Sequence, residues 1–486
     1  MAAVAALLAS KFWLAKHFTA EQLTTAAANV VSDKSVAVLP FLDMSEKRDQ
    51  EYFADGTAEE ILDLLAKVPG LHVPARTSSF YFKGKSEDIP TIARRLMVAN
   101  VLEGSVRKSG DNVRITVQLV RADNGFHVWS ETYDRKLDDI FKVQDEIAGK
   151  VVRALKISLG AKEVPSAAPT KSAEAYTLLL QARFFLNRET EDDCKTAAGY
   201  YQQVVQLDPD AAVAWAELSE ALRCTGVLTG RTVQQVRAPA LQAAEHAIAL
   251  DPKLAEAHVA LAQIRYWFDW DWAAADAEYE TARALDPANS HALSGAGGLA
   301  AIRGSLSDSL RLSEQAAAKD PLNQFALAYI AATYFAMGQF KDAAAAARKA
   351  AELGPTWPGS HTGLAQMLLA QGQQDAALAE IEKESDQGYR AYALARTYIV
   401  LGHRVDADAA LAQAEKIFAA NQPYNIATLH ALRGELDQAI LWLNRAYQQH
   451  DPVIVGMPPI TVDPDMKDLR RDPRYKAFLR KMNLPE

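Results

Sequence analysis

A chain of 486 residues is too long for one hydrophobic core, because single cores stop growing near roughly 250 to 300 residues, so several structural units are expected. Its 49% hydrophobic content is typical of a folded body. The net charge of -9 argues against binding to phosphate backbones, which needs clustered Lys and Arg. We therefore expect no nucleic-acid partner.

The N-terminal stretch MAAVAALLASKFWLAKHF, residues 1–18, allows two interpretations. A membrane-spanning helix needs about 20 mostly apolar residues, whereas this stretch is shorter and contains Lys11 and Lys16. It is either the amphipathic start of a soluble helix or a marginal membrane anchor. We assign residues 1–33 to a possible membrane anchor and its linker.

The next stretch combines a strand with an acidic segment. Residues 34–41, KSVAVLPF, predict a buried strand, and Thr57 with Glu60 forms a capping box that predicts a helix start. Carboxylates in the loop between them, such as Asp43 and Asp55, could act as oxygen ligands of a hard cation. They also suit a solvated loop whose acids favour a helix N-terminus, and we prefer this scaffold interpretation.

The rest of residues 34–158 predicts a mixed domain. LHVPA, residues 71–75, is expected to be a second strand, and Asp88 opens a following helix. Three β-rich runs separated by SGD and ADN predict an antiparallel meander, and apolar residues every four positions predict a closing helix. Residues 34–158 are therefore assigned to an α+β domain.

Repeats dominate the remainder of the chain. After an Ala-, Pro- and Ser-rich linker at residues 159–171, prolines recur at positions 209, 252, 287, 321 and 355. The last intervals, close to 34 residues, are the period of tetratricopeptide (TPR) helix pairs. We predict an all-α TPR superhelix over residues 172–452, with about eight helix pairs by period alone, and a C-terminal end segment at 453–486.

The runs SVAVLPF, DQEYFADG, ARTSSF, VLEGSVRK and WSETYDR carry a family resemblance. With them, residues 34–158 resemble the TolB amino-terminal-like domains that precede TPR arrays in membrane-anchored bacterial regulators of the cyclase-associated and CadC-like type. The resemblance implies a membrane-associated location, on the periplasmic side, with the cytoplasm as the alternative. In that family a cyclase or winged-helix output domain is often attached, and neither pattern occurs in this sequence.

No nucleophile and base pair, paired histidine ligands or phosphate-binding loop can be named, so we predict neither an enzyme nor a cofactor or metal site. The favoured function is a protein-interaction or sensory scaffold, membrane-tethered as the resemblance implies. The alternative is the regulatory half of an adenylate or guanylate cyclase, or of a winged-helix transcription activator, whose output domain is missing.

The concave surface of the first helices is the predicted peptide-binding groove. It is expected to present Glu220, Arg223, Gln263, Tyr266, Trp267, Phe325, Phe335 and Gln366. This set is aromatic and nearly neutral, so we predict partners that are proteins or peptides with apolar or aromatic segments.

Cys194 and Cys224 are the two cysteines of the chain. Each lies 15 positions from Pro209, so two antiparallel helices folded about that turn bring them to the same level. Packed helices permit a disulfide there without requiring it. Two free cysteines that pack as small apolar residues are the favoured interpretation, and a bridge is the alternative.

Overall fold

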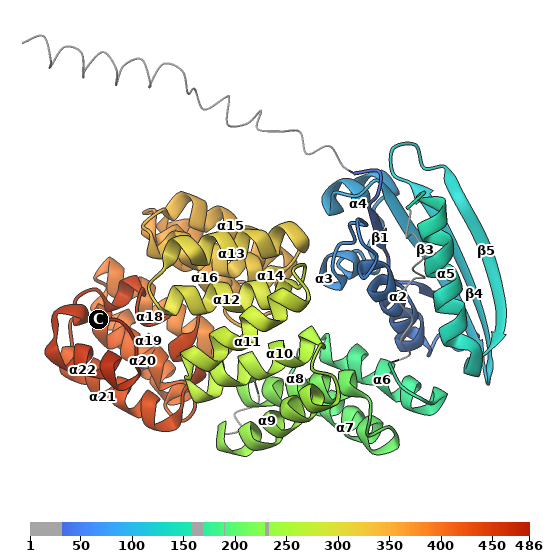
Figure 1. The fold of residues 1–486 in the computed structure, drawn as a ribbon. Helices are drawn as coiled ribbons and strands as arrows, with labels where there is room; N and C mark the ends of the chain where they lie inside the picture. Colours follow the sequence, from blue (N-terminus) through green and yellow to red (C-terminus); the bar gives the residue numbers. More distant parts are fainter. Residues whose placement is uncertain (1–31, 158–168, 189, 229–232) are drawn as a thin grey trace, which may run out of the picture.

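The computed structural model describes residues 32–157, 169–188, 190–228 and 233–486 (Figure 1). The predicted anchor at residues 1–18 and most of the linker at 159–171 lie outside the described residues. The first part of the chain contains β1 (Val36–Val38), β2 (Leu42–Asp43), α2 (Glu51–Ala66), α3 (Arg76–Phe80), α4 (Ile89–Leu96), β3 (Asn100–Ser109), β4 (Asn112–Arg121), β5 (His127–Lys136), η1 (Leu137–Asp139) and α5 (Ile140–Ala154).

These strands form one mixed sheet in the order β1-β3-β4-β5, with β2 also paired to β3. β1 and β2 run parallel to β3, and the pairs β3–β4 and β4–β5 are antiparallel, which confirms the predicted meander. The core of this part forms where α2 and α5 cover one face of the sheet, as Figure 1 shows. At α4, the Asp88 side chain accepts a hydrogen bond from the Thr91 N–H at 2.8 Å, as a helix cap does.

Two local predictions are wrong in this region. The predicted capping box lies inside α2, which already begins at Glu51, and Thr57 Oγ1 donates to the Phe53 carbonyl at 2.8 Å. The helix extends through the acidic stretch because Phe53 and other apolar residues of its first turns are buried against the sheet. The predicted strand at 71–75 is reduced to a single bridge between Ser35 and His72, since Pro74 has no N–H to donate.

The helices of the repeat region are α6 (Ala173–Leu186), α7 (Glu191–Leu207), α8 (Ala212–Leu228), α9 (Val233–Leu250), α10 (Ala255–Ile264), η2 (Arg265–Asp269), α11 (Trp272–Leu285), α12 (Ser290–Ile302), α13 (Leu306–Lys319), α14 (Gln324–Ala336), α15 (Phe340–Leu353), α16 (Ser360–Ala370), α17 (Gln374–Ile381), α18 (Gln387–Leu401), α19 (Arg404–Phe418), α20 (Pro423–Leu432) and α21 (Leu436–Gln449). The C-terminal segment adds η3 (Pro452–Val455), η4 (Pro464–Met466), η5 (Leu469–Arg471) and α22 (Pro473–Lys481).

The helices from α6 to α21 pack as successive antiparallel pairs, each against the next, and form a TPR-like superhelix. Close packing of the second helices needs small residues, and Ala240, Ala275, Ala343 and Ala377 on four of these helices are fully buried. The fold class is thus a small mixed-sheet α+β domain followed by an all-helical superhelix. The long interval between Pro209 and Pro252 reflects longer helices, because α8 has 17 residues and α9 has 18.

The sheet domain is joined to the array at two places. Arg183 of α6 lies between Glu60 of α2, with which it forms a buried ion pair, and Glu217 of α8, 3.0 Å away. At the second place, Asp320 accepts a hydrogen bond from the Ser78 N–H at 3.1 Å in the turn before α14. The domain therefore contacts both the first helix pair and a turn deep in the array.

Candidate partner-binding face

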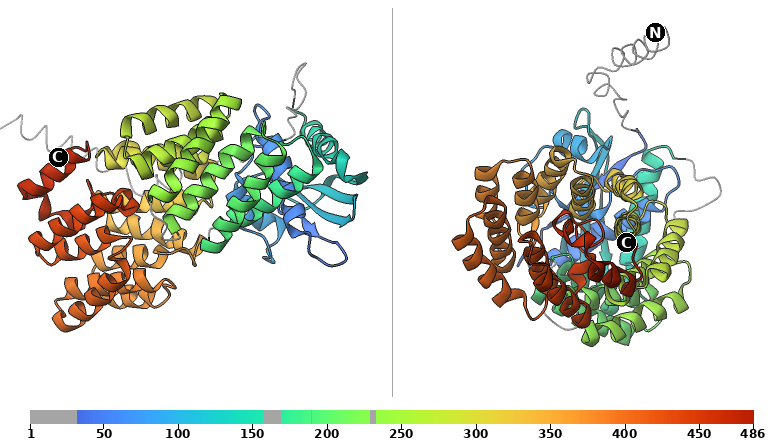
Figure 2. Two further views of the ribbon diagram at one scale, coloured as in Figure 1. Left: turned by 90° about the horizontal axis from the view of Figure 1, so that it is seen from below. Right: turned by 90° about the vertical axis from the view of Figure 1, so that its left-hand side faces the viewer.

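The C-terminal segment, residues 452–486, lies on the inner face of the superhelix. The right-hand view of Figure 2 shows this segment inside the curve of the array. Its fully buried apolar side chains share one hydrophobic cluster with residues of α10, η2, α11, α12 and α20. They are Ile454, Val455, Ile460, Met466 and Leu469.

Hydrogen bonds hold the segment against helices of several pairs. The Tyr266 hydroxyl donates to the Val455 carbonyl at 2.9 Å, and Thr461 Oγ1 donates to the carbonyl of Ile302, the last residue of α12, at 2.8 Å. Near the chain end, Trp272 Nε1 donates to the Met482 carbonyl at 2.7 Å. Contacts with helices far apart in sequence therefore fix the segment in one position.

A buried ion pair lies at the centre of this contact. Arg396 of α18 donates from Nε to Asp465 Oδ2 at 2.7 Å and from Nη2 to Oδ1 at 2.9 Å. The side chains are 7% and 6% exposed. Paired donors on a planar guanidinium match both carboxylate oxygens, so the pair fixes the position of η4 against α18.

Two other carboxyl groups are buried nearby. Asp463 accepts from the Tyr424 hydroxyl at 3.2 Å, and Asp451 accepts from the Tyr424 N–H at 2.8 Å. Burial, reinforced by the neighbouring Asp465, raises the pKa of Asp463 to about 7. Burial also raises the pKa of Asp451 to about 7.

The predicted groove residues separate into three groups. Tyr266 and Phe335 are each only 2% exposed, so the expectation that they form an accessible binding surface is wrong. Tyr266 lies beneath the C-terminal segment, and Phe335 packs in the core around α14 and α15. Gln366 faces the same segment, and its Nε2 lies 3.5 Å from Asp465 Oδ2. Trp267 is half-buried and contacts the Tyr266 ring edge-on, with the ring centroids 5.3 Å apart.

The remaining four residues are partly exposed. Arg223 donates from Nε to Glu220 at 2.9 Å on α8, and these side chains are 17% and 33% exposed. Burial raises the pKa of Glu220, but Arg223 outweighs this effect and leaves the pKa below its ordinary value. Gln263 is half-buried, and its side-chain oxygen has no hydrogen-bond partner among the described residues. The Phe325 ring contacts the Trp357 ring edge-on, with the ring centroids 5.1 Å apart.

The acidic stretch near β2 fits the expected solvated loop only in part, because Asp43 precedes α2 whereas Asp55 is buried inside that helix. Asp43 accepts hydrogen bonds from the Ser45 N–H at 2.9 Å and the Gln50 N–H at 2.8 Å, just before α2. Asp55 is paired with Lys83, which also lies 2.6 Å from Glu51. Within the described residues, no group of three or more His, Cys, Asp or Glu side chains could hold a metal ion.

The contacts that sequence reasoning missed involve buried arginines. Arg396 lies in the otherwise apolar run AYALARTYIV, and Arg183 lies in LLLQARFFL. A charged residue on the packed side of a helix needs a buried partner, so the sequence at these two positions does indicate a buried ion pair. The partners could not be identified, because Glu60 and Asp465 are distant in sequence and follow no repeat period.

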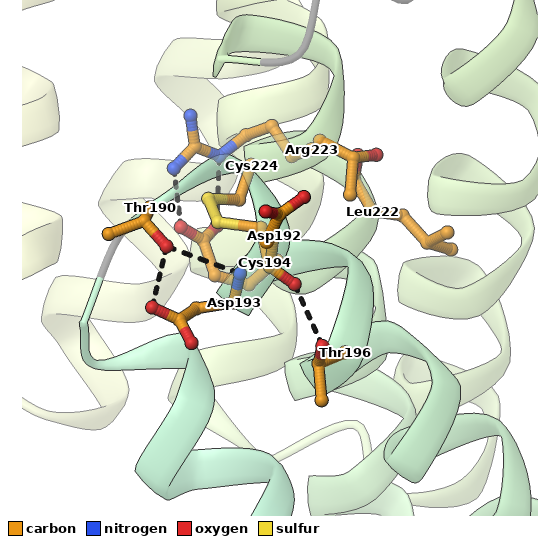
Figure 3. Close-up of a disulfide and its surroundings, with 10 residues drawn as sticks. Thr190, Asp192, Asp193, Cys194, Thr196, Leu222, Arg223 and Cys224 are labelled. Atoms are coloured by element: carbon orange, nitrogen blue, oxygen red, sulfur yellow. Dashed lines mark hydrogen bonds and ion pairs between the residues drawn. A yellow bond between two sulfur atoms is a disulfide. The ribbon is translucent and has the colours of Figure 1, made fainter.

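The two cysteines are joined, which corrects the interpretation that favoured free thiols. Cys194 near the start of α7 and Cys224 near the end of α8 form a disulfide, with their Cα atoms 6.0 Å apart. Figure 3 shows the bond between the two helices, next to the side chain of Arg223. The turn centred on Pro209 does bring the two helices level, and both cysteines face inward.

The helices within residues 32–157, 169–188, 190–228 and 233–486 include none with the length and apolar character needed to cross a bilayer. The predicted membrane tether therefore stays a prediction.

Part of the chain is similar to a domain of a known protein family. A family described as the HilA/YgeH-like transcriptional regulator, second domain, matches residues 32–150. The TolB-like resemblance remains an expectation. The putative adenylate cyclase 3 of Rhizobium meliloti (strain 1021) is 40% identical over 238 residues, which is 48% of this chain. The chain spans only 40% of the length of that relative.

Several solved structures are similar to part of the chain at low sequence identity. Human IFIT1 bound to m7Gppp-AAAA has a TM-score of 0.45 at 15% identity, covering 63% of this chain and 77% of that one. PilF of Pseudomonas aeruginosa has a TM-score of 0.35 at 19% identity, covering 43% and 93%. The Cut9 and Hcn1 assembly of the APC/C has a TM-score of 0.44 at 14% identity, covering 68% and 62%.

Proposed function

We propose that the chain is a non-enzymatic interaction or sensory scaffold, whose partners bind the part of the inner face that the C-terminal segment leaves uncovered. The observation that carries the proposal is a partly exposed aromatic pair, Phe325 in the first turn of α14 and Trp357 between α15 and α16, whose ring centroids lie 5.1 Å apart. Aromatic side chains give large contact areas at low conformational cost, which suits binding of apolar or aromatic peptide segments. Glu220, Arg223 and Gln263 add polar groups that could orient such a segment.

A binding assay on the intact chain tests this proposal. Fluorescence anisotropy with labelled peptides, half of them aromatic-rich and half polar, should show preference for the aromatic set. Phe325→Ala should weaken the best peptide about tenfold, on the order of 1.4 kcal/mol. Leu441→Ala on α21 is the matched control, because Leu441 is an exposed apolar side chain of the array. Equal binding of both peptide sets, or unchanged binding by a folded Phe325→Ala variant, would contradict it.

The proposed location is membrane-associated, on the periplasmic side, with the cytoplasm as the alternative. The disulfide between Cys194 and Cys224 supports an oxidising compartment, because such bonds rarely persist in a reducing cytosol. Cell fractionation should give a pellet that resists salt washing and dissolves in detergent. Recovery of the whole protein in the soluble cytosolic fraction would reject the tether.

A second candidate is the regulatory half of a cyclase or a winged-helix activator. The similarity to a putative adenylate cyclase and to a transcriptional regulator domain favours it. A cyclase or winged-helix reading frame upstream of Met1 and in phase with it would promote this candidate. If the purified chain itself converts ATP into cyclic AMP and pyrophosphate in a buffer that contains Mg²⁺, the non-enzymatic proposal is wrong.

A further inference from the structure

The outer edge of the sheet domain is paired with no other described strand. β5 comes last in the strand order β1-β3-β4-β5 and pairs, among the described strands, with β4 alone. Figure 1 shows β5 on the outer side of the domain, away from the helical array. A strand from another molecule can therefore approach this edge from the side opposite the array.

The backbone groups that this edge presents follow from the ladder. In an antiparallel pair, alternate residues point their N–H and C=O toward the neighbouring strand. The Leu137 N–H donates to the Asp111 carbonyl at 2.8 Å, so the odd-numbered residues of the regular ladder bond to β4. The even-numbered residues, whose side chains are exposed, point their backbone groups outward. They are Ser130, Thr132, Asp134 and Lys136.

These outward backbone groups are available for pairing. Among the described residues, no hydrogen bond outside the strand ladders involves the four N–H groups. Of the four carbonyl groups, that of Asp134 accepts from the exposed side chain of Arg135 at 3.0 Å. A strand edge of this kind is a template for pairing with another strand.

β5 is complementary to a second copy of itself. An antiparallel pair with its two-fold axis at Tyr133 places Thr132 opposite Asp134 of the second copy. The same register places Ser130 opposite Lys136, so all the outward N–H and C=O groups find partners.

The same register also pairs opposite charges. Glu131 lies directly opposite Arg135 of the second copy, and the symmetry repeats this pair, so two ionic contacts cross the interface. Within one copy, Glu131 pairs with Lys150, and Arg135 lies 3.5 Å from Glu146. Glu131 and Arg135 are 34% and 43% exposed, so each can also reach across the edge. A two-fold axis at Thr132 would place Glu131 opposite Tyr133 and lose the charge pairing.

Two exposed apolar side chains lie at the start of the same strand. Phe126 and Val128 are 71% and 42% exposed. With the axis at Tyr133, the start of β5 lies beside η1 of the second copy. Pairing would remove part of this apolar surface from water, which favours association.

We propose that two copies of the chain pair through β5, antiparallel and with the two-fold axis at Tyr133, so that their sheets join into one. A second copy is the occupant of the edge, because backbone pairing and charge pairing agree in one symmetric register. One strand from each copy makes a small interface, and small interfaces give weak, concentration-dependent association. The dimer goes beyond the proposed function, since it uses the sheet domain and not the inner face of the array.

Sedimentation velocity of the intact chain from about 1 to 200 μM tests the dimer. Thr132→Pro removes an outward N–H that β4 does not use, and proline is tolerated on edge strands, so the monomer should stay folded. The variant should raise the dissociation constant of the dimer about tenfold or more, because symmetry doubles the lost hydrogen bond. Thr132→Ala is the matched control, because it loses the same side chain but keeps the N–H. It should dimerise like the wild type.

Exchanging the charges tests the register and the identity of the occupant. Arg135→Glu places a second acid opposite Glu131, and Glu131→Arg places a second base opposite Arg135. Each variant alone should therefore dimerise about tenfold or more weakly than the wild type. An equimolar mixture of the two variants restores both opposite-charge pairs in a mixed dimer, so it should regain the association of the wild type.

A wild-type chain that stays monomeric over the whole range would overturn the proposal and leave the edge to a strand of another protein. Equal dimerisation of Thr132→Pro and Thr132→Ala would also overturn it, because the contact would then lie elsewhere. Charge variants that dimerise alone like the wild type, or a mixture that stays monomeric, would refute the register. The charge variants decide the matter if Thr132→Pro does not fold.

Discussion

Removing Arg396 should be among the most damaging single changes in the array. Its side chain is 7% exposed and binds both oxygens of Asp465, which is 6% exposed. Arg396→Met keeps most of the side-chain volume but leaves the Asp465 charge buried without its guanidinium. The nearest remaining side-chain donor is Gln366, at 3.5 Å. Breaking a buried pair in this way costs about 3 to 5 kcal/mol.

A double variant separates the charge effect from simple loss of packing. Arg396→Met combined with Asp465→Leu removes both charges and leaves apolar side chains, which is often close to neutral for a buried pair. We therefore expect the double variant to regain most of the stability lost by the single one. Such non-additivity is the expected sign of direct coupling between neighbours.

Urea unfolding followed by circular dichroism and by tryptophan fluorescence measures these differences, and Arg311→Met serves as control. Arg311 pairs with Asp308 across one helical turn, with both side chains more than half exposed, so its loss should change stability little. The reasoning is refuted if Arg396→Met unfolds at the same urea concentration as Arg311→Met. It is also refuted if the double variant is no more stable than Arg396→Met alone.

Three further outcomes follow from the structure. Reducing the disulfide, or the substitution Cys194→Ser, should lower the free energy of unfolding by roughly 3 to 4 kcal/mol, because the bond joins residues 30 positions apart. Equal urea midpoints for the oxidised and reduced protein would contradict this. Gly295→Ala should destabilise the array by roughly 1 to 3 kcal/mol, because the new Cβ would collide with the Tyr279 ring. The control is Gly199→Ala, whose Cβ would enter open space and which should be neutral or slightly stabilising. Thermal unfolding measures both effects. Arg183→Met leaves the buried Glu60 and the partly buried Glu217 without their cation, so calorimetry should show the sheet domain unfolding separately and earlier. A single unchanged transition would count against this joint.

The sequence predicted the features that repeat or depend on neighbours. Prolines at a nearly constant interval mark the ends of second helices, and Ala275 and Ala343 lie where two helices approach closely, so the period alone located the pairs. The antiparallel meander followed from β-rich runs and turn residues in the same way. The capping box at Thr57 failed because burial of Phe53 extended the helix, which is a tertiary effect that outweighs a local signal.

The inner face was harder to predict because its state depends on distant contacts. Tyr266 does point toward the inside of the superhelix, but the C-terminal segment covers it through Val455, 189 positions away in the sequence. No local periodicity shows where a non-repetitive segment will pack. The two cysteines were wrongly expected to be free for a related reason, since helix geometry permits such a bond but the inward direction of both side chains depends on packing.

The central claim is that the chain's own C-terminal segment occupies the inner face of the repeat array. Hydrogen-exchange mass spectrometry of the intact protein at pH 6 tests it most directly. Peptides within 452–484 should be protected as strongly as peptides from α12 and α20, against which the segment packs. Exchange of residues 452–484 within seconds, while α12 and α20 stay protected, would contradict the claim and leave the groove open.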